Sequence, residues 1–181
     1  MGKKLILASG SPRRAKILAS LGIPFEVVRT DAEEVSWPHD PVRTVEENAR
    51  AKGAAARKLF PSPDMDILSA DTIVWHAGRI YGKPRDLDEA RRFLRELSGR
   101  THVVYTAVAL NGAVRVEESH VTFHALTDAL LEDYVARVRP TDRAGAYDID
   151  ESGDLIVSHW EGSYENIMGL PVEPLREWGL V

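Results

Sequence analysis

The pattern of hydrophobic and polar positions near the start of the chain predicts a strand followed by a helix. Residues 5–8 form an uninterrupted apolar run, which is typical of a buried strand. After a small polar turn, Ser11 is suited to cap a helix and Pro12 to occupy its first position. Apolar residues then recur at helical spacing as far as Gly22, where we expect the helix to end.

The rest of the chain alternates between further strands and helices. Asn111-Gly112 predicts a tight hairpin turn between two strands. Thr44, with Glu47 three residues later, predicts the N-terminus of one helix, and Asp86 with Glu89 predicts another. Thr127 is expected to cap a third helix. The patterns predict strands at 25–30, 67–75, 101–110, 113–125 and 155–160, a polar acidic loop at 31–41, and helices at 45–59, 86–98, 127–138, within 162–171 and near the C-terminus.

The order of these elements indicates the fold class. Strands and helices alternate, but an antiparallel hairpin lies in the middle of the chain. This combination favours an α/β fold with a mixed sheet over a purely parallel one. Because no repeat or linker interrupts the pattern, we expect residues 1–181 to form a single domain.

Composition excludes several classes of partner. The net charge is −5, which argues against broad binding to a nucleic-acid polymer. There is no cysteine, so disulfides and thiolate metal sites are excluded. No apolar run approaches the roughly 20 residues that a membrane helix needs, and the run after Lys3-Lys4 is too short for a signal peptide. We therefore expect a soluble cytoplasmic protein without a membrane partner.

The first helical turn carries a candidate anion site. Arg13 and Arg14 lie where the helix dipole is positive, so their charges cost stability unless an anion is bound. A phosphate there meets free backbone N–H groups and two guanidinium groups. The alternative is a helix start whose arginines point into water.

A second candidate is Asp71, which interrupts an apolar strand pattern together with Thr72. A carboxylate in such a place is costly to bury unless it is paired or functional. The alternative is a turn at the end of a strand, in which Asp71 is a structural hydrogen-bond acceptor.

Six short motifs in a fixed order give the chain its resemblance to a known family. Together they resemble the Maf family of nucleoside triphosphate pyrophosphatases. They are Ala8-Ser9-Gly10-Ser11-Pro12-Arg13-Arg14, Ser69-Ala70-Asp71-Thr72, Gly82-Lys83-Pro84, Leu97-Ser98-Gly99-Arg100-Thr101-His102, Ala144-Gly145-Ala146-Tyr147 and Asn166-Ile167-Met168-Gly169-Leu170-Pro171.

The resemblance implies an elongated mixed sheet with two lobes around a cleft, as in inosine-triphosphate pyrophosphatases. It implies hydrolysis of a nucleoside triphosphate to the monophosphate and pyrophosphate, and it suggests a homodimer. Asp71 matches the proton acceptor of the family, and Arg13 and Thr72 match residues tied to substrate choice. The other positions that match the phosphate and metal site are Ser9, Arg14, Glu34, Lys52 and Lys83.

Elementary chemistry agrees with these assignments. Cleavage between the α- and β-phosphates requires a cationic environment for the leaving pyrophosphate, which arginines, lysines and a divalent metal supply. Asp71 is suited to accept a proton from the attacking water. Glu34 and Asp71 are suited to hold Mg²⁺ or Mn²⁺, because hard cations prefer carboxylate oxygens.

Two departures from the family pattern concern the nucleobase. Arg143 stands where the pyrimidine-specific subgroup usually has lysine, and Asp150 stands where that subgroup has glutamine. An ionised aspartate only accepts hydrogen bonds, whereas glutamine also donates them. Asp150 suits the N3–H of uracil or thymine, but it also suits a cationic base. For the neighbouring acids, Asp148, Glu151 and Asp154, we expect a solvated loop.

Three functions therefore remain open. The flanking motifs favour a dTTP and UTP pyrophosphatase. An acid near Asp150 also occurs in the 7-methylguanosine subgroup, which makes 7-methyl-GTP the alternative substrate. The third possibility is a nucleotide-binding regulator of cell division without turnover, because the family is associated with septum formation.

Overall fold

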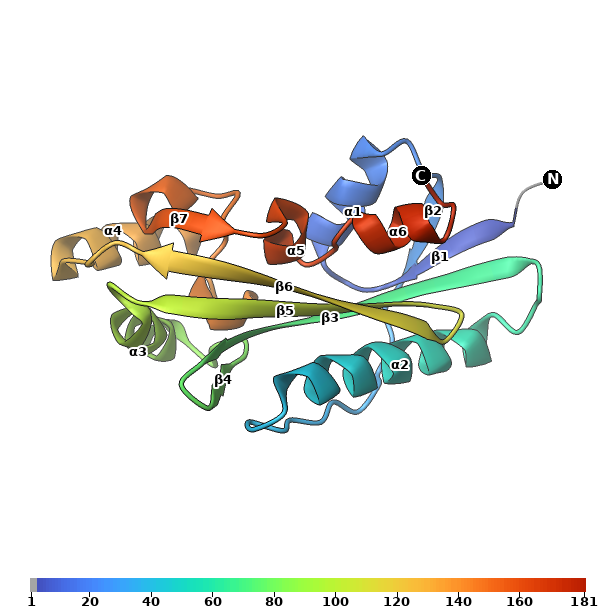
Figure 1. Ribbon diagram of the computed structural model, residues 1–181, viewed down its shortest axis with the longest axis horizontal. Coiled ribbons are helices and arrows are strands. Elements are labelled where there is room, and N and C mark those ends of the chain that lie inside the picture. The colour runs from blue at the N-terminus through green and yellow to red at the C-terminus, as the bar shows by residue number, and fades with distance from the viewer. Residues whose placement is uncertain (1–2) are drawn as a thin grey trace.

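The computed structural model describes residues 3–181 and shows a mixed sheet flanked by helices (Figure 1). The α/β class and the mixed sheet expected from the sequence are confirmed. The sheet has seven strands within the described residues, in the order β2-β1-β3-β5-β6-β7, with β4 paired to β3. The strands are β1 (Lys4–Ala8), β2 (Phe25–Val28), β3 (Met65–His76), β4 (Arg79–Tyr81), β5 (Thr101–Leu110), β6 (Ala113–Phe123) and β7 (Val157–Glu161).

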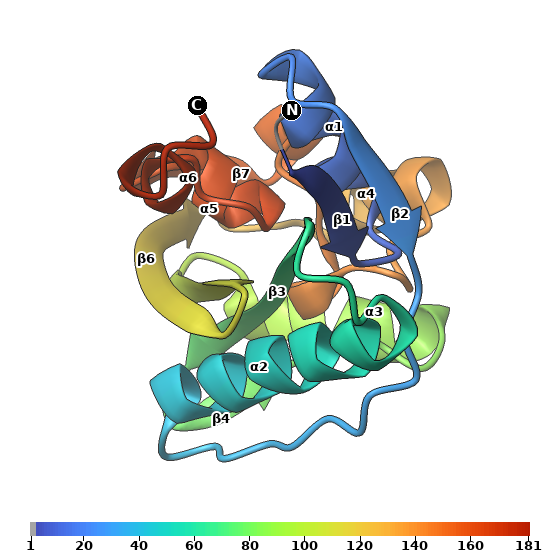
Figure 2. The ribbon, with the colours of Figure 1, turned by 90° about the vertical axis from the view of Figure 1, so that its right-hand side faces the viewer.

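The helices cover both faces of the elongated sheet. Figure 2 shows α2 along one face, with α1, α5 and α6 on the other, whereas α3 and α4 lie toward the far end. The α-helices are α1 (Pro12–Ser20), α2 (Pro41–Leu59), α3 (Leu87–Leu97), α4 (Asp128–Val138), α5 (Tyr164–Met168) and α6 (Glu173–Glu177). Two short 3₁₀ turns, η1 (Ala144–Ala146) and η2 (Gly153–Leu155), lie between α4 and β7.

Strand directions divide the sheet into two parts. Strand β1 runs parallel to β2 and β3, whereas the pairs β3–β4, β3–β5, β5–β6 and β6–β7 are antiparallel. The β5–β6 hairpin turns at Asn111 and Gly112, whose φ angles of 51° and 92° fit the predicted tight turn. The parallel part therefore carries the first helix, and the antiparallel part provides the long strands.

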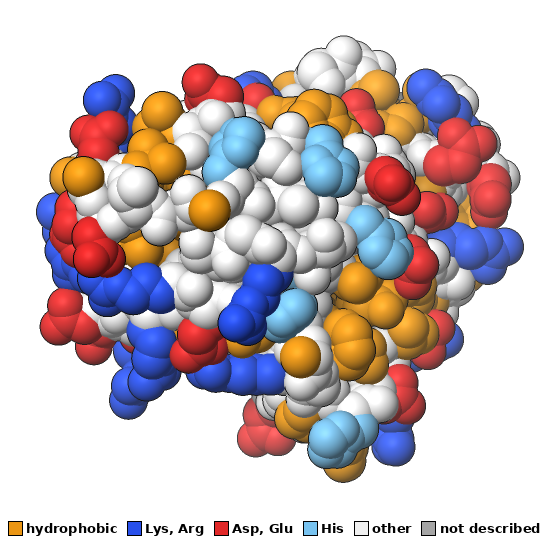
Figure 3. Space-filling view, turned by 60° about the vertical axis from the view of Figure 1, so that its left-hand side comes forward, with side chains coloured by type: hydrophobic (Ala, Val, Ile, Leu, Met, Phe, Trp, Pro, Cys, Tyr) orange, Lys and Arg blue, Asp and Glu red, His pale blue; other side chains and the backbone are white. Residues whose placement is uncertain are grey.

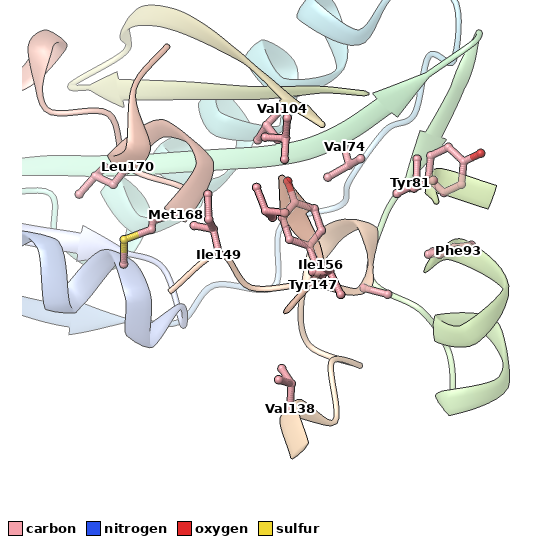
Figure 4. Close-up of a cluster of buried hydrophobic side chains, with 14 of the residues drawn as sticks. Val74, Tyr81, Phe93, Val104, Val138, Tyr147, Ile149, Ile156, Met168 and Leu170 are labelled. Atoms are coloured by element: carbon pink, nitrogen blue, oxygen red, sulfur yellow. The ribbon is translucent and has the colours of Figure 1, made fainter. Parts of the chain in front are cut away.

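The largest hydrophobic cluster packs between the sheet and the helices of the α1 face. Figure 4 shows part of it, with Tyr147, Val74 and Val104 close together beneath the sheet. Gly145 is required there, because a Cβ at this position would lie 2.7 Å from Val74 Cγ2, and its φ is +68°. This packing holds η1 against β3.

Several predicted helix ends are confirmed, and one is wrong. The side chains of Asp86 and Thr127 cap α3 and α4. Helix α2 begins at Pro41 and not at residue 45, and its cap is Asp40, which accepts from the Arg43 amide at 3.0 Å. Proline suits the first helical position because it has no N–H to satisfy, so Pro41 with Asp40 outcompetes Thr44 as the start.

Two other predictions need correction. The Ser11 side chain makes no capping hydrogen bond, although the residue does occupy the N-cap position of α1. The strand expected at 67–75 is not interrupted at Asp71, because β3 is one continuous strand of twelve residues that includes Asp71. Asp71 and Thr72 remain in the ladder because both pair with β5, opposite Ala107 and Thr106.

Among the described residues, no helix is long and apolar enough to cross a bilayer. Figure 3 shows the end of the molecule near α3, α4 and β7, where histidine side chains are scattered singly over the surface. Within residues 3–181, no group of three or more His, Asp or Glu side chains is arranged to hold a metal ion.

Candidate functional site

One edge of β3 is open in the middle of the sheet. On this edge β1 pairs with β3 up to Ser69, and β4 pairs with it from Val74 onward. Within the described part of the chain, residues 70–73 therefore have a partner strand only on the β5 side. Because successive side chains of a strand point to opposite faces, Asp71 faces α2 and Thr72 faces α1.

A cavity of about 420 Å³ opens at this gap. Seven of the residues predicted from the sequence line it: Arg13, Arg14, Glu34, Lys52, Asp71, Thr72 and Lys83. They come from α1, the 31–40 loop, α2, β3 and the segment after β4. The remaining lining residues include Ser11, Asn48, Ile80, Tyr147, Asp148 and Gly169.

Asp71 is the central carboxylate of the cavity and is only 6% exposed. Lys52 Nζ donates to its Oδ1 at 2.6 Å, and Asn48 Nδ2 donates to its Oδ2 at 3.1 Å. Both partners come from α2, one turn apart. This arrangement fixes the orientation of the carboxylate at the edge of the cavity.

Lys52 joins Asp71 to Glu34. Its Nζ lies 2.8 Å from Glu34 Oε1 as well as 2.6 Å from Asp71 Oδ1. Partial burial alone would raise the pKa of Glu34, but the hydrogen bond and charge of Lys52, with the charges of Lys83 and Arg14, lower it overall. Glu34 is therefore ionised at neutral pH, and two carboxylates converge on one positive charge.

Asn48 also holds the loop that carries Glu34. Its Oδ1 accepts from the Val35 amide at 2.8 Å, and its Nδ2 donates to the Val35 carbonyl at 3.0 Å. Farther along the loop, the Trp37 amide donates to Thr44 Oγ1 at 2.8 Å. Sequence reasoning missed Asn48, because an asparagine inside an alanine-rich helix carries no distinctive local signal.

Arg14 is a buried cation held by neutral acceptors. Its Nε donates to the Gly169 carbonyl at 2.7 Å, its Nη1 to Ser9 Oγ at 2.9 Å, and its Nη2 to Thr72 Oγ1 at 3.0 Å. Burial lowers the pKa of Arg14 to about 10, against the opposing charge of Asp71. Within residues 3–181, Arg14 forms no ion pair at contact distance, so it is electrostatically suited to an incoming anion.

Ser9 supports this arginine and does not line the cavity itself. Its Oγ also accepts from the Ser11 amide at 3.2 Å. The predicted alternative, in which both arginines point into water, is therefore wrong for Arg14. Lys83 lines the cavity near Gly82, whose carbonyl accepts from the Gly145 amide at 3.1 Å and so ties this segment to η1.

Arg13 forms an ion pair with Asp148, a carboxylate that the sequence analysis predicts to be exposed to solvent. Its Nη1 lies 3.6 Å from Asp148 Oδ2, and Asp148 is only 6% exposed. Arg143 Nε donates to the same oxygen at 3.0 Å. The expectation of a solvated acidic loop is therefore wrong for Asp148, because two arginines draw its carboxylate inward. Glu151, by contrast, is exposed.

The apolar part of the cavity lies beside η1. Tyr147, Val74 and Val104 line it, and Figure 4 shows them together. The Tyr147 hydroxyl is 2.9 Å from His102 Nε2. Burial, together with the charge of His76, lowers the pKa of His102 to about 3, so the imidazole is neutral. A flat, apolar wall of this kind suits one face of a nucleobase.

Asp150 lies outside the lining of the cavity. Its carboxylate forms an ion pair with Lys16 on α1 and accepts from the Tyr164 hydroxyl at 3.3 Å. Its predicted contact with the base therefore stays a prediction, and it requires Asp150 to exchange Lys16 for the ligand.

The donor set fits a divalent cation that is shared with a substrate. Glu34 and Asp71 already surround one cationic group, Lys52 Nζ. Two carboxylates are too few to enclose a metal, but Mg²⁺ is commonly held by one or two carboxylates together with substrate phosphates and water.

These features define a class: an α/β protein whose sheet-edge cavity combines an oriented carboxylate with cations suited to a phosphorylated ligand. Within that class the chain belongs to the Maf-like protein family, whose sequence model matches residues 4–178.

Its relatives include curated proteins of similar length. It is 43% identical over 177 residues to the dTTP/UTP pyrophosphatase of Chromobacterium violaceum, and the aligned region covers 93% of this chain and 89% of the relative. It is 41% identical over 181 residues to the dTTP/UTP pyrophosphatase of Bacillus cereus, with 96% and 87% covered. The protein of the same description from Bacillus cytotoxicus is 41% identical over 178 residues.

Proposed function

We propose that this protein is a nucleoside triphosphate pyrophosphatase that converts dTTP and UTP to the monophosphate and pyrophosphate. The observation that carries the proposal is Asp71, a buried carboxylate oriented by Lys52 and Asn48 in a cavity that also holds Arg13, Arg14 and Lys83. Membership of the Maf-like family and the descriptions of the relatives support the substrate class.

In the proposed reaction Asp71 accepts a proton from a water molecule. The water oxygen forms a bond to the α-phosphorus as the bond from that phosphorus to the bridging oxygen breaks, and the electron pair of the broken bond leaves with pyrophosphate. A positioned general base of this kind contributes a rate factor of about 10²–10⁴. Asn48 keeps Oδ2 in place, and Lys52 keeps Oδ1 in place.

The cations of the cavity bind and neutralise the phosphate chain. Among residues 3–181, Arg14 has no carboxylate partner at contact distance, and Lys83 lines the same cavity from the segment after β4. Positive groups that are fixed before the reaction stabilise the charge that develops on the leaving group. Ser9 acts through Arg14 by accepting its Nη1 hydrogen bond, and Thr72 accepts from Nη2.

Glu34 and Asp71 would hold the divalent cation, Mg²⁺ or Mn²⁺. When bound, the metal supplies positive charge to the phosphate oxygens. We further propose that the protein works in the cytoplasm as a single domain, possesses no nucleic-acid polymer or membrane partner, and forms a homodimer. The family resemblance supports the homodimer.

The test is pyrophosphate release from a panel of dTTP, UTP, CTP, 5-methyl-UTP, GTP and 7-methyl-GTP with Mg²⁺ or Mn²⁺. Wild type and Asp71→Asn are compared with Asp66→Asn, which changes an acid on the same strand that binds Lys3 and Asn111. We expect turnover of dTTP and UTP by wild type and Asp66→Asn, and its loss in Asp71→Asn. Turnover of 7-methyl-GTP alone identifies the alternative substrate, and nucleotide binding without turnover identifies a regulator.

A further inference from the structure

Two carboxylates that the proposed reaction does not use line the cavity: Asp142, which is largely exposed, and the buried Asp148. Asp148 follows Tyr147 in the sequence and lines the cavity, with only 5% of its side chain exposed. An uncompensated negative charge in a cavity for an anionic ligand opposes binding. The position of Asp148 therefore requires an explanation.

Asp148 is anchored firmly by its own segment. Its Oδ1 accepts from the Asp150 amide at 2.9 Å, and its Oδ2 accepts from Arg143 Nε at 3.0 Å. Its backbone N–H donates to the Tyr134 hydroxyl at 2.9 Å. The carboxylate thus stays in place whether or not Arg13 is near.

Arg13 is held more loosely. Its guanidinium lies 3.6 Å from Asp148 Oδ2, which is an ion pair but is longer than a hydrogen bond. No other ion pair of Arg13 is present among residues 3–181, and 21% of its side chain is exposed to the cavity and solvent. Arg13 can therefore turn toward a phosphate without leaving Asp148 unpaired, because Arg143 remains bound.

We propose that Asp148 is a positioning residue that acts through Arg13. Its carboxylate is a counter-anion that holds the Arg13 guanidinium at the cavity. When an anionic ligand binds, Arg13 leaves Asp148 and pairs with the ligand. The exchange lowers the affinity for triphosphate and for product alike, and so favours release of pyrophosphate. This inference rests on the proposed function for its substrate, but not for the ion-pair exchange itself.

The first measurement is the affinity for inorganic pyrophosphate by titration calorimetry, which needs no turnover. We expect Asp148→Asn to bind pyrophosphate at least about threefold more tightly than wild type, because Arg13 loses its competing anion. Glu151→Gln is the matched control: it removes another carboxylate bound to Arg143, at 2.6 Å, but from the exposed side. Its affinity is expected to stay within about twofold of the wild-type value.

Steady-state kinetics with dTTP provide a second readout. Asp148→Asn is expected to lower KM and to lower kcat, because product leaves more slowly, and Asp148→Glu is expected to restore both in part. If Asp148 had a purely structural role, its substitution would reduce the fraction of active enzyme, which lowers kcat without lowering KM. If Asp148→Asn does not fold, Asp148→Ser removes the same charge with a smaller side chain.

The Arg13→Ala background tests whether Asp148 acts through Arg13. There the substitution Asp148→Asn is expected to change the pyrophosphate affinity by less than about twofold. The proposal is overturned if the affinity is unchanged or weaker in Asp148→Asn, if the gain persists without Arg13, or if wild type and variant both fail to bind pyrophosphate. Tighter pyrophosphate binding through Arg13, without release of pyrophosphate from any nucleotide, would retain this inference and refute the proposed function.

Discussion

Asn48 Nδ2 lies 3.1 Å from Asp71 Oδ2, and both side chains are almost completely buried. The same amide group binds the amide and the carbonyl of Val35 at 2.8 and 3.0 Å. One side chain therefore fixes the proposed base and the loop that carries Glu34. Lys52 also joins these two parts of the site, and β3 adds a hydrogen bond to the loop farther along, from Trp75 Nε1 to the Pro38 carbonyl at 2.9 Å.

Asn48→Ala is expected to reduce kcat for dTTP by about tenfold or more, because Asp71 loses the partner that orients Oδ2. It is also expected to lower the free energy of unfolding by about 1–3 kcal/mol, the usual cost of leaving buried polar groups unpaired. Initial rates and urea unfolding measure the two effects. Arg50→Ala, on the same helix but bound to the Gly112 carbonyl, is the control. An unchanged kcat in Asn48→Ala would show that Asp71 needs no such support.

Arg14→Lys tests the buried guanidinium. Three separate nitrogens of Arg14 donate to Gly169, Ser9 and Thr72, and a single ammonium group cannot reproduce this fork. We expect KM for dTTP to rise by about tenfold and the stabilisation of the protein by pyrophosphate, measured as a rise in Tm, to shrink. Arg115→Lys changes an exposed ion pair with Glu177 and serves as the control. Equal Tm shifts in both variants would contradict an anion site at Arg14.

The sequence predicts the elements of this fold well where local chemistry decides them. The Asp86 and Thr127 caps and the Asn111-Gly112 turn are confirmed, because each depends on residues close together in the chain. The start of α2 is wrong, since two plausible caps lie four residues apart and Pro41 decides between them.

The site is predictable only in part, for a physical reason. Arg14 and Thr72 are 58 residues apart and meet through the packing of α1 against the open edge of β3. The motifs assign such residues to one site, but they do not predict which of these residues contact one another. Asp148 is held in place by Arg143 and by the Asp150 amide, with Arg13 nearby, and its burial cannot be predicted from the acidic segment alone. Asn48 carries no motif and becomes visible only through its contacts with Asp71.

Glu34→Gln tests the proposed metal ligand. Because the pKa of Glu34 is lowered, its carboxylate is ionised and free of protons at neutral pH. We expect EDTA to abolish pyrophosphate release, and we expect Glu34→Gln to need about tenfold more Mg²⁺ for half-maximal activity, since a neutral amide is a weaker ligand than a carboxylate. Glu33→Gln, the adjacent exposed acid, is the control. The same Mg²⁺ requirement in all three proteins would remove Glu34 from the metal site.

His102 predicts a loss of stability in acid. Its pKa is about 3 in the folded protein, against an ordinary value of 6.5, so the unfolded chain binds the proton more strongly between these values. The free energy of unfolding therefore falls as the pH drops below about 6.5, and His102 accounts for about 2 kcal/mol between pH 7 and pH 5. His102→Gln is expected to remove this part of the pH dependence in urea unfolding. His120→Gln, at an exposed position, is expected to retain it.

Asp150→Asn tests whether Asp150, which stands in place of the usual glutamine, recognises the nucleobase. An ionised carboxylate only accepts hydrogen bonds, whereas an amide also donates one to the unprotonated N3 of cytosine. If Asp150 exchanges Lys16 for the ligand, the ratio of kcat/KM for CTP to that for UTP is expected to rise by about threefold or more in Asp150→Asn. Lys16→Gln breaks the same ion pair without changing the acid, so its ratio is expected to match wild type. An unchanged ratio in Asp150→Asn would mean that Asp150 serves only to bind Lys16, and that base recognition depends on the residues that line the cavity.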